Sequence, residues 1–172
     1  SGSGYIGGLV AFNSGTITQS YSTGVVSGSS YVGGLVGSND NSGKITQSYS
    51  TGVVSGSGDF VGGLVGCNYS GTITQSYWDK ETSGQNTSSG GEGKTTAEMK
   101  QQGTYVDWDF ATVWTIEEGV SYPYLRASGP TQEPTVIEID SLSKLQLVGS
   151  NWDYPMWGHY KLVADIDASD TI

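Results

Sequence analysis

SGSSYVGGLVGSNDNSGKITQSYSTGVV, residues 27–54, is the stretch that decides the fold, because close copies of it stand on either side. The copy before it, residues 1–26, reads SGSGYIGGLVAFNSGTITQSYSTGVV, and the copy after it, residues 55–82, reads SGSGDFVGGLVGCNYSGTITQSYWDKET. The ITQSY core recurs every 28 residues. A fixed period of this length is the signature of a repeat architecture.

Within each copy the pattern is that of short strands, and no helical period is present. The segments are rich in Thr, Val, Ile and Tyr and are bounded by Gly, Ser and Asn, which is typical of strands and turns. A unit of this size cannot bury its own apolar face, whereas stacked units can. The sequence therefore predicts an all-β fold, a parallel β-helix or β-solenoid with rungs of about 28 residues and one or two short capping helices.

Stacking places equivalent residues of successive rungs in columns about 4.8 Å apart. We expect an aliphatic ladder, an aromatic ladder and an amide ladder whose side chains hydrogen-bond along the stack. Alternation along the ITQSY strand predicts that Ile and Tyr point inward and that Thr and Ser point outward. The three structural ladders are Ile17, Ile45 and Ile73; Tyr21, Tyr49 and Tyr77; and Gln19, Gln47 and Gln75.

The chain changes character after the three repeats of residues 1–82. Residues 83–127 are expected to form a Gly/Ser/Thr loop, a short helix opened by a capping box at Thr95, and an aromatic-rich cap that closes the end of the solenoid. The proline-containing stretch 128–135 is expected to be a linker. Residues 136–172 are expected to be the opening segment of a following or neighbouring solenoid unit.

Composition and charge exclude several classes of function. The chain has seven Lys and Arg against 17 Asp and Glu, a net charge of −10, so it lacks the clustered cations that nucleic acids and anionic membranes attract. No apolar run approaches the roughly 18 residues of a membrane span. Cys67 is the only cysteine, which excludes an internal disulfide and a cysteine-based metal framework. We expect no nucleic-acid partner and no membrane span in this segment.

Residues suited to catalysis are few. His159 is the only histidine; it lies between two aromatic residues and is expected to pack rather than to catalyse. The stretch SSGGEGKT, which contains Lys94, departs from a phosphate-binding loop because Ser88 stands at the first glycine. We expect no catalytic residue and no cofactor, and substitution of His159 or Lys94 should leave any measurable activity intact.

Two weaker kinds of site stay open. Asp165, Asp167 and Asp170 could gather oxygens for Ca²⁺, but their spacing lacks the glycine and the terminal Glu of a calcium loop, so a solvated acidic turn is the simpler interpretation. Asn68 and Asn86 open Asn-x-Ser/Thr triplets and are candidate glycosylation sites.

The GGLVG and GTIT-x-SYSTG spacing resembles the GLUG repeat family of bacterial and archaeal surface proteins. The resemblance covers residues 1–82, and residues 77–126 look like the usual C-terminal close of such arrays. The segments IEIDSLSKLQLVG and HYKLVADIDAS, within residues 137–169, look like the usual opening of one. The resemblance implies an extracellular, mostly β-helical adhesin or stalk, and it carries over no catalytic residue.

The expected function is therefore structural or adhesive. We expect a secreted or cell-surface protein, not an enzyme, that serves as a stalk, adhesin or filament subunit and joins end to end with copies of itself or adjoining repeats. Further partners would be surface glycans or proteins of host or neighbouring cells. Two alternatives are a carbohydrate-binding module, which outward aromatics beside a groove would favour, and a polysaccharide-active β-helix enzyme. The enzyme would need a cleft with two acids about 5–10 Å apart.

Overall fold

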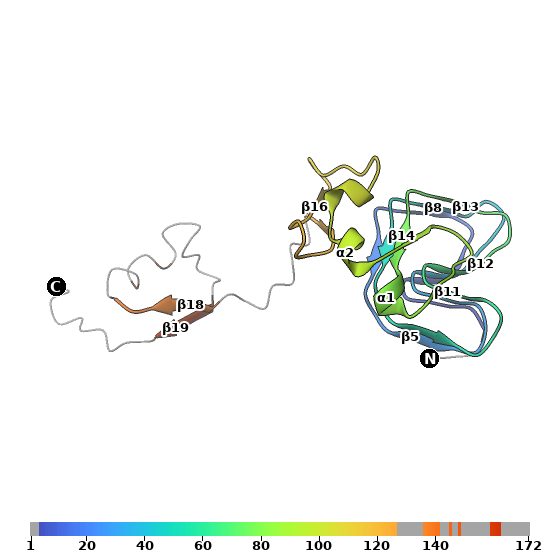
Figure 1. Cartoon of the computed structure of the whole chain (residues 1–172), viewed down its shortest axis with the longest axis horizontal. Helices are drawn as coiled ribbons and strands as arrows, with labels where there is room; N and C mark the ends of the chain where they lie inside the picture. The colour runs from blue at the N-terminus through green and yellow to red at the C-terminus, as the bar shows by residue number, and fades with distance from the viewer. Residues whose placement is uncertain (1–3, 127–135, 142–144, 146–147, 149–158, 163–172) are drawn as a thin grey trace. The chain divides into compact units, whose positions relative to one another are not determined.

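A computed structural model of the chain describes residues 4–126, 136–141, 145, 148 and 159–162. The chain divides into two compact units, residues 1–127 and residues 128–172. In unit 1 the chain winds through successive rungs of very short strands that lie on top of one another (Figure 1). The predicted all-β parallel solenoid is confirmed.

Each rung repeats the same order of strands. Rung 1 contains β1 (Ile6–Gly7), β2 (Val10–Asn13), β3 (Thr16–Thr18), β4 (Tyr21–Ser22) and β5 (Val26–Gly28). Rung 2 contains β6 (Val32–Gly33), β7 (Val36–Asn39), β8 (Lys44–Thr46), β9 (Tyr49–Ser50) and β10 (Val54–Gly56). Rung 3 contains β11 (Val61–Gly62), β12 (Val65–Asn68), β13 (Thr72–Thr74) and β14 (Tyr77–Asp79).

Every pair between rungs is parallel, with equivalent residues in register. Ile45 pairs with Ile17 on one side and with Ile73 on the other, and Tyr49 does the same with Tyr21 and Tyr77. The three isoleucines and the three tyrosines therefore each form a column through the rungs. The small differences in rung length fall in turns: Val32 pairs with Ile6 across 26 residues and with Val61 across 29.

The interior of the stack is filled by aliphatic side chains and one indole. The cluster contains the leucine and the valine of the GGLV core in rungs 2 and 3, and all four side chains are completely buried. It also contains the isoleucine column. Trp78 of rung 3 belongs to it and stands where rungs 1 and 2 have Ser22 and Ser50. A larger side chain therefore fills the interior at the C-terminal end of the stack.

The expected alternation along ITQSY is wrong beyond its second residue. Gln19, Gln47 and Gln75 all have a φ of 48°, so the chain turns a corner at each glutamine instead of continuing as a strand. The turn reverses the orientation of the residues after it. Ser48 and Ser76 are buried, and the tyrosine column packs on the outer side of the stack against residues 99–125.

The glutamines also do not form the expected amide ladder. The side-chain amide of Gln47 donates to the backbone oxygen of Asp107 at 2.6 Å, and that of Gln75 donates to the carboxylate of Asp107 at 2.8 Å. A corner residue projects away from the stack, so its amide reaches the segment that covers the flank rather than the next rung.

Residues 83–93 are expected to be a loop, but residues 84–94 form an incomplete fourth rung. The N–H of Gly63 donates to Thr87 O, the N–H of Ser89 donates to Val65 O, and β15 (Glu92–Lys94) pairs in parallel with β14. The side-chain amide of Gln85 donates to Val54 O at 2.8 Å. This short segment covers the C-terminal edges of β11, β12 and β14. The aromatic-rich residues 105–125, called the aromatic block below, do not cover them.

Two one-turn helices follow rung 3. Asp79 caps α1 (Lys80–Ser83) by accepting from the N–H groups of Glu81 and Thr82. Thr95 caps α2 (Thr96–Met99), and the Glu98 carboxylate accepts a hydrogen bond from the Thr95 N–H at 2.7 Å. The predicted capping box is therefore present. The 3₁₀ turn η1 (Gln102–Thr104) comes next.

The aromatic block lies along the flank of unit 1 rather than over its end. It contains the antiparallel pair β16 (Trp114–Thr115) and β17 (Tyr124–Leu125). Trp114, completely buried, contacts the rings of both Tyr21 and Tyr49, and Tyr105 contacts that of Tyr77. Because these tyrosines come from three successive rungs, the block runs along the stack and ties the rungs together.

Unit 2 contains a two-stranded parallel sheet within its described residues. β18 (Val136–Ile139) pairs with β19 (His159–Leu162), so that Val136 faces His159 and Ile139 faces Leu162, 23 residues further along the chain. After β18 the N–H of Leu145 donates to Ser141 O at 3.1 Å, which is the spacing of a helical turn. The expected linker at 128–135 lies outside the described residues.

Candidate functional site

The N-terminal edge of rung 1 is the most unusual surface of unit 1. In the sheets of the described chain β1, β2, β3 and β4 each lie at an outer edge, with a partner strand on one side. An edge of this kind presents a row of unpaired N–H and C=O groups, which is a template for another strand.

The apolar side chains at this edge are exposed as well. Leu9 is 48% exposed, whereas its equivalents Leu35 and Leu64 are completely buried. The same leucine is thus an interior residue in rungs 2 and 3 and a surface residue in rung 1. A further rung laid on this edge would bury it.

An asparagine ladder runs through the stack and gives it a direction. The Asn13 amide donates to Asn39 Oδ1 at 2.7 Å, and the Asn39 amide donates to Asn68 Oδ1 at 2.9 Å. Asn39 is completely buried. Asn13 Oδ1 accepts from the Gly15 N–H, and because an amide oxygen has two lone pairs it has room for a donor from a preceding rung. The ladder thus points an acceptor out of the N-terminal edge.

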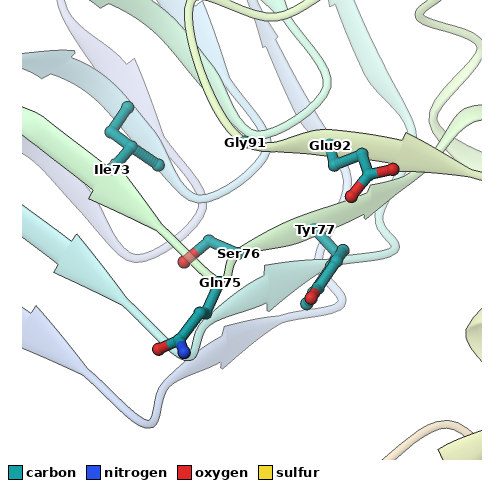
Figure 2. A pocket seen from close by; sticks show the side chains of 6 residues that line it. All are labelled: Ile73, Gln75, Ser76, Tyr77, Gly91 and Glu92. Carbon is teal, nitrogen blue, oxygen red and sulfur yellow. The ribbon is translucent and has the colours of Figure 1, made fainter. Parts of the chain in front are cut away.

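A shallow pocket of about 220 Å³ lies at the other end of the stack. It forms where the incomplete fourth rung passes over β13 without pairing with it, so that Gly91 and Glu92 stand opposite the corner at Gln75 and Ser76 (Figure 2). Glu92 is the only acid among its lining residues and forms an ion pair with Lys94. Glycoside hydrolysis requires two carboxyl groups facing the substrate, and this pocket supplies one.

The cluster on the flank shifts the pKa of several tyrosines. Burial raises the pKa of Tyr49, Tyr105 and Tyr77. Burial, together with the bond that the Tyr122 hydroxyl donates to the buried carboxylate of Asp79 at 2.7 Å, raises the pKa of Tyr122 to about 12. All four hydroxyls stay protonated over the physiological range, which suits a packing role.

The structure places the two glycosylation candidates differently. Asn68 stands in the asparagine ladder, and its side-chain amide also donates to Gly71 O at 3.0 Å. Asn86 is exposed on the fourth rung. Of the two, Asn86 has the amide that a modifying enzyme could reach without breaking the ladder.

The remaining candidates come together in no shared site. The Ser88 hydroxyl accepts from the Val65 N–H at the edge of rung 3, and Lys94 lies in β15, so residues 88–94 belong to the stack. Only Thr95, the last residue of the SSGGEGKT stretch, leads into a helix, the one-turn α2. Asp165, Asp167 and Asp170 lie outside the described residues. Among the residues that are described, no three His, Cys, Asp or Glu side chains gather as metal ligands. No helix in that part of the chain is long and apolar enough to cross a membrane.

The comparison with protein families agrees with the rung geometry. The model of the GLUG motif matches residues 28–55, which span rung 2 from the end of β5 to β10. The chain contains a GLUG motif. No curated protein and no solved structure matches it. In this GLUG-motif protein the matched segment is one full turn of the solenoid, and rungs 1 and 3 are its structural copies.

Three features of this GLUG-motif protein were missed in the sequence. The asparagine ladder had a signal, since Asn13, Asn39 and Asn68 each stand three residues after the GGLV core. Trp78 also had a signal in the sequence, because it replaces the second serine of the SYS segment. The fourth rung had none, because its strand β15 has the sequence Glu-Gly-Lys, which no strand pattern favours.

Proposed function

We propose that this chain is a non-catalytic structural segment of a secreted or cell-surface protein, and that it joins end to end with copies of itself or with adjoining repeats through the N-terminal edge of rung 1. The observation that carries the proposal is the difference between Leu9, half exposed, and its completely buried equivalents Leu35 and Leu64. The exposed leucine at this edge is explained if a further rung packs on rung 1 and buries Leu9 as Leu35 and Leu64 are buried.

Unit 2 supplies a suitable surface for this contact. Its β18 and β19 pair with each other and, within the described residues, with no third strand. A two-stranded sheet is marginal by itself and gains from further strands. The strands β18, β19 and β2 have four residues each. We propose that β18 or β19 of one copy pairs with β2 of the next, a head-to-tail contact that continues from copy to copy.

The structural role also explains why most of the buried polar groups hydrogen-bond within the protein. The asparagine ladder and the column of Ser20, Ser48 and Ser76 satisfy groups within the stack. The carboxylate of Asp79 accepts from α1, from α2 and from the Tyr122 hydroxyl, and so ties the covering segments to the stack. A rigid stack whose rungs are tied by internal bonds and by a covering flank suits a stalk or spacer. An adhesive role and the extracellular location belong to the proposal.

Light scattering coupled to size exclusion tests the contact. The native chain, 18.0 kDa, should show species of higher mass that grow with concentration. Leu9→Lys should reduce them, because a charge would be buried at the contact. Val53→Lys is the matched control, since Val53 is 50% exposed but lies in rung 2, away from the edge. A native chain that remains monomeric at every concentration would contradict end-to-end assembly.

A further inference from the structure

A column of aromatic rings stands on a second surface of unit 1, which meets the edge of rung 1 at Tyr5 and Phe12. Tyr5, Tyr31 and Phe60 precede β1, β6 and β11 at equivalent positions of the three rungs. The ring centroids of Tyr5 and Tyr31 are 4.7 Å apart, and those of Tyr31 and Phe60 are also 4.7 Å apart with the rings parallel to within 2°. The spacing is that of the rungs, so the column follows the stack.

Two further rings widen the column. Phe12 packs edge-on against Tyr5 with centroids 5.6 Å apart, and the Tyr69 hydroxyl lies 3.2 Å from that of Tyr31. We call these five rings the aromatic stripe. It consists of Tyr5, Phe12, Tyr31, Phe60 and Tyr69.

The aromatic stripe is exposed, unlike the tyrosine ladder. Tyr5 is 44% exposed, Phe12 45%, Phe60 40% and Tyr69 52%. The Tyr21–Tyr49–Tyr77 column is covered by the flanking block, but no described segment covers the stripe to a similar degree. Single exposed apolar residues are ordinary, whereas contiguous rings on a surface mark an interaction site.

The backbone holds one ring of the stripe at a cost. Tyr31 has a φ of 41°, a left-handed conformation that is unfavourable for a bulky side chain. That conformation places its ring between Tyr5 and Phe60. Strained residues of this kind cluster at sites of function, where the surrounding structure holds them in place.

The chemistry around the stripe selects its ligand. No Lys or Arg lies within ten residues of any of the five rings along the chain, where Asp40 and Asp59 are the nearest charged residues to Tyr31 and Phe60. A nucleic acid would need cations beside the rings. The stripe instead offers flat apolar rings, tyrosine hydroxyls and a surrounding sequence rich in Ser and Gly.

We propose that the aromatic stripe binds a neutral polysaccharide. Because neighbouring rings of the column cover each other's faces, the apolar C–H groups of a pyranose ring pack on the exposed ring edges, and its hydroxyl groups bond to tyrosine and serine hydroxyls beside them. Tyrosine suits such a surface because it combines an apolar body with a polar tip. Rings repeated from rung to rung would contact successive sugars of a chain, so each additional rung adds binding area.

Affinity electrophoresis tests this proposal on the full chain. The probes are gels containing soluble β-glucan, xyloglucan or galactomannan, with cellulose and chitin used for sedimentation. At least one polymer should retard or sediment the native chain. Phe60→Leu and Tyr5→Leu, which keep apolar bulk but remove the ring, should each weaken binding about tenfold, the factor that corresponds to the upper range of about 1.4 kcal/mol for an aromatic contact. Val53→Leu is the control and should bind as the native chain does.

Three results would overturn the proposal. They are binding to none of the five polymers, binding that survives both ring substitutions, and equal loss in Val53→Leu. If Phe60→Leu lowers the mass in light scattering while no polymer binds, a second copy covers the stripe and the proposal is wrong. Leu9→Lys separates this site from the end-to-end contact, because it should retain polysaccharide binding.

Discussion

Gly63 lies directly against the indole ring of Trp78, so that a Cβ at position 63 would overlap the ring. The equivalent Gly34 stands in the same relation to Ser50, whose Oγ would lie 2.6 Å from such a Cβ. The second glycine of each GGLV core thus permits close approach between opposite walls of the rung. The main role of this second glycine is therefore to allow close packing rather than to form a turn.

Gly63→Ala should destabilise unit 1 by about 2 kcal/mol or more, because overpacking a filled interior forces neighbouring groups apart. Urea unfolding followed by far-ultraviolet circular dichroism measures the change. Gly103→Ala is the matched control, since a Cβ at Gly103 would have no atom within 4 Å. Equal unfolding midpoints for the two variants would show that Trp78 yields without cost.

The asparagine ladder predicts a second large effect. Asn39→Ala removes the donor to Asn68 and the acceptor for Asn13, both inside the stack. Leaving a buried polar group unsatisfied costs about 1–3 kcal/mol, and two groups are affected. We expect a loss of roughly 2–4 kcal/mol in the free energy of unfolding.

Asn86→Ala provides the comparison for that measurement, because Asn86 is an exposed asparagine of the same unit. It should leave the free energy of unfolding within about 0.5 kcal/mol of the native value. The ladder would lose its stabilising role if the two variants unfolded alike.

The repeat period was sufficient to predict the solenoid and the column register. Ile17, Ile45 and Ile73 recur at a fixed interval, and only parallel stacking brings them together. Alternation was not sufficient to predict side-chain direction, because it assumes a continuous strand. At Gln47 the backbone turns with a φ of 48°, and glutamine is not a residue that usually signals such a corner.

The surfaces were predicted less well than the interior for a related reason. Pattern reasoning detects apolar faces, but the fourth rung pairs through backbone groups and short side chains such as Ser88. The sequence also did not indicate which surface the aromatic block covers. Nothing in the spacing of Trp108 and Trp114 distinguishes a block that closes an end from one that covers the tyrosine column.

The corner glutamines allow a substitution that should stabilise the protein. A left-handed residue other than glycine costs about 1–2 kcal/mol, and glycine itself loses about 0.5–1 kcal/mol of chain entropy. Gln19→Gly should therefore raise the free energy of unfolding by about 0.5 kcal/mol. Thermal unfolding gives the shift directly.

Gln75→Gly is the informative partner of that substitution. Gln75 has the same φ of 48° but donates to the Asp107 carboxylate at 2.8 Å. Losing this bond should offset the backbone gain, so Gln75→Gly should be no more stable than the native chain. A larger gain at position 75 than at position 19 would show that the flanking block does not depend on Asp107.

Alkaline pH should unfold unit 1 through its tyrosines. Burial raises the pKa of Tyr49, Tyr105 and Tyr77 above the usual 10.0, and that of Tyr122 to about 12. An unfolded tyrosine releases its proton near pH 10, while the folded one keeps it, so above pH 10 the unfolded state binds fewer protons. The stabilisation is thus complete below pH 10 and is lost as the pH rises through the folded values.

A pH titration that follows tyrosinate absorbance and circular dichroism together measures this effect. The cluster should ionise in one cooperative step that coincides with loss of the β signal, because the buried hydroxyls become accessible only on unfolding. Tyr122→Phe should reduce the steepness of the step, since it removes the residue whose pKa of about 12 falls within the range of the titration. A smooth titration of every tyrosine near pH 10, with the β signal unchanged, would mean that the flanking block does not exclude water from the tyrosine column.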